Sequence, residues 1–125
     1  MNAVERAREG YGQNSAPIKS ARAAEYDTIA RVSHRLRDAA LGKHKDFPGF
    51  VAALSDNSRL WTALALDVAQ EENGLPQELR ARIFWLAEFT THETRRILQG
   101  EADVGILIEV NAAILQGLRQ RELVS

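Results

Sequence analysis

The stretch that comes nearest to a catalytic motif is residues 92–96, which read His-Glu-Thr-Arg-Arg. It begins like the zinc-binding pattern HExxH, in which two histidines four residues apart share one helix face and hold the metal. Arg96 stands where the second histidine is required, so this zinc site cannot form. The other histidines, His34 and His44, are ten residues apart in the sequence. We therefore expect no metal site, and we interpret His92 as a polar residue on a helix surface.

No other pattern of residues indicates catalysis. The chain has no cysteine, which excludes disulfides, a thiol nucleophile and cysteine-ligated metal centres. No nucleophile elbow is present, and no glycine-rich loop follows a strand. The acidic pair Glu71-Glu72 is typical of a solvated helix end. The sequence therefore predicts that the protein is not an enzyme and needs no cofactor.

The densest group of positive charges lies in the first half of the chain. It consists of Arg31, Arg35, Arg37, Lys43 and Lys45. Two aspartates, Asp27 and Asp38, interleave with these residues, and no aromatic platform for stacking bases accompanies them. The net charge of the whole chain is −1. The group is interpreted as a solvated face or a contact for an acidic protein surface, and direct binding of nucleic acid is disfavoured.

The elements that carry these residues are predicted to be helices. Apolar residues make up 45% of the 125 residues, and they recur at steps of three and four rather than two. We expect an all-α fold, a compact bundle of four main helices over about 17–42, 48–71, 76–99 and 103–118. Short loops favour antiparallel neighbours. Residues 1–16 are weakly patterned and allow a short helix over about 2–9, residues 17–118 form the helical domain, and residues 119–125 form a polar tail.

The helix over 48–71 contains a conflict between local and periodic signals. Residues 55–58 read Ser-Asp-Asn-Ser, which is typical of a turn. The apolar register nevertheless continues through them from Phe47 to Val68, and a break would seldom preserve that phase. We therefore predict one uninterrupted helix. Gly74, which follows it, is suited to a left-handed helix cap.

The predicted register turns Asn57 inward, and Asn111 lies in the apolar stripe of the last helix. A buried amide needs hydrogen-bond partners. We predict that both asparagines are buried and hydrogen-bonded. Two interpretations remain open at this point: a structural polar link that sets helix register, or a polar anchor for a bound peptide.

The last predicted helix has more apolar surface than one stripe requires. Besides its main stripe it carries a second line of Ile106, Val110 and Ile114, so it is either central in the core or docked on a partner. Trp85 and Arg96 lie off the main stripe of the preceding helix, and both residue types are enriched in binding hot spots. We hypothesise that these five residues form a partner-binding surface.

Two observations bear on the compartment. No run of 18 apolar residues is present, so no membrane insertion is expected. The first twelve residues carry four charges and no apolar run, unlike a secretory signal. Together with the absence of cysteine, this predicts a cytoplasmic protein.

Four segments resemble the FlaF family of flagellar biosynthesis regulators. They are residues 57–68 (Asn-Ser-Arg-Leu-Trp-Thr-Ala-Leu-Ala-Leu-Asp-Val), 73–83, 86–92 and 108–118. The shared pattern includes the run from Asn57 to Trp61 and the later Asn111. The resemblance covers about residues 17–118 and is strongest over 57–118.

The resemblance implies a role in the production and export of flagellin. Family members are linked to flagellin itself and to the flagellin-synthesis regulator FlbT. The implied function is a non-catalytic regulator of flagellum assembly and motility that couples flagellin synthesis to its export, as a secretion chaperone. The alternative is a post-transcriptional regulator that contacts flagellin mRNA directly or through a bound protein.

Overall fold

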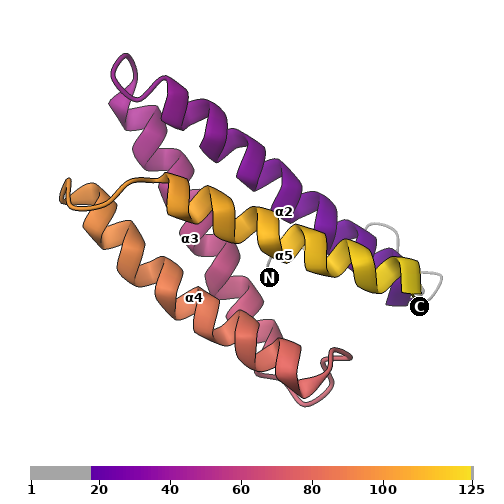
Figure 1. The fold of residues 1–125 in the computed structure, drawn as a ribbon. Coiled ribbons are helices and arrows are strands. Elements are labelled where there is room, and N and C mark those ends of the chain that lie inside the picture. Colours follow the sequence, from indigo (N-terminus) through magenta and orange to yellow (C-terminus); the bar gives the residue numbers. More distant parts are fainter. Residues whose placement is uncertain (1–17, 125) are drawn as a thin grey trace.

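Four helices account for most of the described chain. A computed structural model describes residues 18–124, with side chains described for residues 24–120. The helices are α2 (Ile18–Leu41), α3 (Phe47–Val68), α4 (Gln77–Leu98) and α5 (Gly105–Val124), and each runs antiparallel to the one before it (Figure 1). The described residues contain no strand, which confirms the all-α bundle. The short helix predicted over 2–9 and the weakly structured segment 1–16 lie outside the described residues.

The helices do not pack equally against one another. α2 packs against α3 and α5, and α3 packs against α4, whereas α4 and α5 have few contacts. Figure 1 shows these two helices meeting near the loop of residues 99–104 and diverging toward their other ends. The bundle is therefore closed along three of its four helix pairs and more open along the fourth.

Helix α3 confirms the prediction of one continuous helix through residues 55–58. The Asp46 side chain caps its start by accepting a hydrogen bond from the backbone N–H of Gly49 at 3.0 Å, and Pro48 occupies the first turn. Both residues suit these positions, because the first N–H groups of a helix have no partner within it.

The end of α3 differs from the prediction. The helix stops at Val68 rather than near residue 71, and Gly100 is the glycine with positive φ among the described residues, not Gly74. The guanidinium of Arg80 donates to the carbonyl oxygens of Val68 at 2.8 Å and Gln70 at 2.6 Å. A side chain from the next helix thus satisfies the terminal carbonyls that a left-handed cap would otherwise serve.

We expect Arg80→Ala to lower the free energy of unfolding by about 1 kcal/mol, because the carbonyl of Val68 at the end of α3 and that of Gln70 in the following turn lose a charged donor. Urea unfolding followed by circular dichroism measures this change. Arg82→Ala, an exposed arginine on the same helix, is the matched control. Equal effects of the two substitutions would contradict a capping role for Arg80.

Helix α5 is longer than predicted. It continues to Val124, six residues beyond Leu118, so most of the segment expected to be a polar tail is helical. Arg119, Gln120 and their neighbours up to Leu123 include no glycine or proline, and arginine, glutamine, glutamate and leucine all favour helix. The end of the apolar stripe therefore did not mark the end of the helix.

The buried core consists of two apolar clusters stacked along the bundle. The first contains Ile29, Leu60, Trp61, Leu64, Val68, Ile83, Ala87 and Ile114. The second contains Leu36, Phe50, Ala53, Leu54, Ile97, Val104 and Leu107. Each helix contributes to both clusters, so the bundle is held together at both ends of its length.

Candidate functional site

A layer of buried polar side chains lies between the two core clusters, and its most deeply buried members come one from each helix. The four residues are Ser33, Asn57, Thr90 and Asn111, and all are buried. On α3, for example, Asn57 stands between Leu54 of one cluster and Leu60 of the other. The layer therefore crosses the whole bundle and interrupts its apolar core.

Asn111 is the centre of the hydrogen bonding in this polar layer. Its Nδ2 donates to Asn57 Oδ1 at 2.7 Å and to Ser33 Oγ at 2.9 Å, and its Oδ1 accepts from Trp61 Nε1 at 2.8 Å. Asn57 and Asn111 are both 0% exposed. The prediction that both are buried and hydrogen-bonded is confirmed, and their enclosure by the four helices favours a structural link over an anchor for a bound peptide.

The polar layer is not fully paired. Within the described part of the chain, Asn57 Nδ2 and Thr90 Oγ1 are buried and have no hydrogen-bond partner. A buried donor without a partner costs free energy. Of the side-chain amide of Asn57, only the oxygen forms a hydrogen bond, whereas both the oxygen and the nitrogen of the Asn111 amide do.

The five residues expected to form a partner surface differ widely in exposure. Ile114 is 5% exposed and belongs to the first core cluster. Val110 is half-buried against that cluster, and Ile106 is half-buried against the other. The second apolar line of α5 is therefore largely used in packing the bundle, because α5 covers the core beside α2.

The two α4 members of that set have different surroundings. Arg96 forms an ion pair with Glu93 at 3.1 Å and donates to the carbonyl oxygen of Glu101 at 3.1 Å, so it ties α4 to the following loop. Trp85 is exposed and stacks on Phe89, with ring centroids 5.5 Å apart. Of the five residues, only Trp85 presents a large exposed side chain.

The group of basic residues is partly engaged within the bundle. Arg35 on α2 pairs with Asp56 on α3 at 3.2 Å, and the Lys43 ammonium lies 5.9 Å from the centre of the Phe50 ring. The Arg35–Asp56 pair offsets part of the positive charge that a polyanion would otherwise meet. His92 is exposed, and no group of three histidine, cysteine or acidic side chains suited to a metal occurs within residues 24–120.

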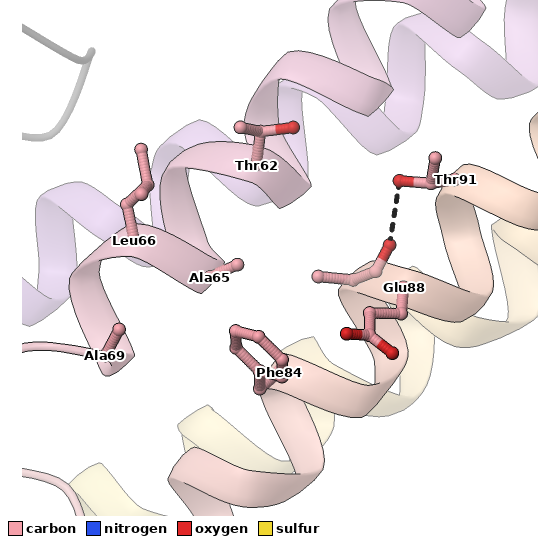
Figure 2. A pocket seen from close by; sticks show the side chains of 8 residues that line it. Thr62, Ala65, Leu66, Ala69, Phe84, Glu88 and Thr91 are labelled. Atoms are coloured by element: carbon pink, nitrogen blue, oxygen red, sulfur yellow. Dashed lines mark hydrogen bonds between the residues drawn. The ribbon is translucent and has the colours of Figure 1, made fainter.

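A surface pocket lies between α3 and α4, at a place that the sequence analysis did not identify. Its cavity volume is about 200 Å³. The α3 wall consists of Thr62, Ala65 and Leu66 together with the C-cap residue Ala69, and the α4 wall consists of Phe84, Ala87, Glu88 and Thr91. Figure 2 shows the two walls facing each other, with the Phe84 ring extending from α4 toward α3.

Both walls have the same spacing. Each contains residues i, i+3, i+4 and i+7 of its helix, which is the arrangement of four residues that receives one side chain of a neighbouring helix in knobs-into-holes packing. A cavity of this size is below the usual range of small-molecule sites, which begins at about 300 Å³. The pocket therefore fits a single apolar side chain better than a metabolite.

The chemistry of the pocket is mainly apolar although it contains two threonines. Thr62 Oγ1 donates to the Ser58 carbonyl at 2.9 Å. Thr91 Oγ1 donates to the Ala87 carbonyl at 3.1 Å, the bond drawn as a dashed line in Figure 2. Because both hydroxyls already donate within their own helices, they can act toward a ligand only as acceptors. Glu88 is the charged residue at the edge.

The pocket is surrounded by apolar side chains that the core does not cover. Leu66 is 64% exposed and Phe84 is 45% exposed. The other large exposed apolar residues within residues 24–120 are Leu41, Phe47, Trp85 and Leu98. A usable signal was present in the sequence, because Leu66 and Phe84 lie off the main apolar stripes of their helices. The small lining residues Ala65, Ala69 and Ala87 carry no such signal, because a pocket exists only when both helices are in place.

None of the helices in the described part of the chain is long and apolar enough to cross a membrane.

Comparisons with known proteins give one match. Neither the curated proteins nor the solved structures contain a significant match to this chain. The family model described as flagellar protein FlaF matches residues 7–118, a range that includes the whole polar layer and both walls of the pocket. This match covers most of the sequence, and the chain therefore belongs to the FlaF family of flagellar proteins.

Proposed function

We propose that this protein is a non-catalytic flagellar regulator that binds flagellin or the regulator FlbT. In this role it couples flagellin synthesis to export, as a secretion chaperone acting in the cytoplasm. Membership of the FlaF family supports the flagellar context. The observation that carries the binding role is the apolar pocket between α3 and α4, with Leu66 and Phe84 exposed at its walls.

The proposed mode of binding is an amphipathic helix lying along the α3–α4 face. A helix that docks in a groove inserts side chains that are spaced i, i+3, i+4 and i+7 along its own sequence. The pocket between α3 and α4, about 200 Å³ in volume, can receive one of them. One large apolar side chain of the partner fills the pocket, and its neighbours cover Leu66 and Phe84. Trp85, which follows Phe84 directly and is exposed, extends this surface on the α4 side.

A physical reason links such a surface to export. A filament subunit that is not yet assembled leaves apolar helix faces uncovered, and contiguous exposed apolar patches promote aggregation. A small helical protein that covers one such face keeps the subunit soluble until it is exported. The same occupancy reports how much free flagellin is present, which provides a route to regulating its synthesis.

The test is a calorimetric titration of the purified protein with purified flagellin, and separately with purified FlbT. We expect binding to one of them with a negative change in heat capacity, the signature of apolar burial, and with little dependence on salt. No binding to either protein would contradict the proposal. Tight binding to flagellin mRNA that weakens steeply with salt would instead support the alternative of direct RNA contact.

A further inference from the structure

One line of exposed residues on α4 has a pattern that can pair with itself. Phe84, Thr91 and Leu98 are spaced by seven residues, and Glu88 and Arg95 stand between them. The five positions alternate steps of four and three, so they share one face of the helix. All five are exposed, and Phe84 and Leu98 are similar in this respect, at 45% and 47%.

The two charges on this line are free to act between molecules. Among the described residues, neither Glu88 nor Arg95 takes part in an ion pair. The nearby Arg96 is engaged by Glu93. An acidic and a basic residue seven positions apart on one exposed face attract the same face of an antiparallel copy, whereas a parallel copy would place like charges opposite each other.

We propose that two copies of this chain associate through α4 in an antiparallel pair around a two-fold axis near Thr91. Phe84 and Leu98 are equally distant from Thr91 along the helix, so the axis places Phe84 of each copy beside Leu98 of the other. Glu88 and Arg95 are three and four residues from Thr91, which brings Glu88 of each copy within one residue of Arg95 of the other. The same patch then serves both partners, as a closed two-fold interface requires.

This pairing goes beyond the proposed binding of a flagellar partner and does not depend on it. The α4 wall of the pocket contains Phe84, Glu88 and Thr91, which are three of the five residues in the proposed interface. A second copy and a partner helix would therefore compete for α4. The pair of copies keeps the apolar face covered when no partner is present.

Charge reversal tests the pairing on the full-length protein alone. The molar mass in solution is measured by light scattering and sedimentation over a wide range of concentrations. We expect wild-type protein to form a dimer. Glu88→Arg and Arg95→Glu should each weaken the dimer about tenfold, because each places like charges opposite each other at two symmetric sites. The double variant Glu88→Arg/Arg95→Glu restores opposite charges and should restore the dimer.

The control is Arg82→Glu, the same kind of charge reversal at an exposed position outside this line, which should leave the dimer unchanged. Circular dichroism establishes that each variant is folded. A wild-type monomer at every concentration would overturn the pairing, and so would folded single variants that remain fully dimeric or a double variant that remains monomeric. Because these measurements contain no flagellar partner, a monomer that still binds flagellin or FlbT would refute the pairing and leave the proposed function intact.

Discussion

Asn111→Leu is expected to lower the free energy of unfolding by about 3 kcal/mol, the largest loss among the substitutions considered for the polar layer. Leucine is close to asparagine in size but makes none of its hydrogen bonds. The buried indole N–H of Trp61 would lose its acceptor, and Asn57 would lose the donor to its Oδ1. Because both groups are inaccessible to solvent, neither can recover its bond from bulk water.

Asn57→Leu is the matched comparison at the other end of the same hydrogen bond. Its Nδ2 has no partner among the described residues, so the substitution removes a buried donor that is already unpaired. Asn111 would still donate to Ser33 and accept from Trp61. We therefore expect a loss of only about 1 kcal/mol. Urea unfolding of both variants, monitored by circular dichroism and Trp fluorescence, measures the difference, and equal losses would show that Asn111 is not the centre of the layer.

Leu66→Glu is expected to weaken binding of the flagellar partner about thirtyfold or more. Leu66 lines the pocket and is 64% exposed, so a glutamate there leaves the core intact but places a charge in the proposed interface. A central contact residue typically contributes about 2 kcal/mol or more, which corresponds to this change in affinity. The measurement is the calorimetric titration with whichever of flagellin and FlbT binds the wild-type protein.

The control for this variant is Leu41→Glu. Leu41 is also an exposed leucine, at 83%, but it ends α2 and does not line the pocket. Both variants should keep wild-type helicity and melting temperature. If Leu66→Glu is folded and binds as tightly as wild type, the partner uses another surface. If Leu41→Glu weakens binding equally, the effect arises from added negative charge and not from the pocket.

The polar layer and the pocket have different roles in the bundle: the layer concerns the alignment of the helices, and the pocket concerns the proposed binding of a partner. The layer is enclosed by the helices and links Asn57, Asn111 and Ser33 across three of them, so only one alignment of these helices satisfies its hydrogen bonds. We propose that it sets the register of the bundle, the use of buried polar groups that is best attested in helical assemblies. The pocket depends on that register, because its walls come from two different helices.

The sequence by itself determined the features that follow from helical periodicity. The step of three and four predicted four helices, the continuity of α3 through residues 55–58, and the inward direction of Asn57 and Asn111. These outcomes agree with the structure because the phase of an apolar stripe is a local property. The stripe must face the core wherever that core lies.

Tertiary structure decided everything that depends on how the helices meet. It capped the end of α3 at Val68 with Arg80, which lies on the next helix. It used most of the second apolar line of α5 inside the bundle, with Ile114 in the core, and it left Leu66 and Phe84 uncovered across a pocket between α3 and α4. A single sequence states which faces of a helix are apolar, but the helix packing determines which of those faces are buried, since burial is a property of pairs of helices.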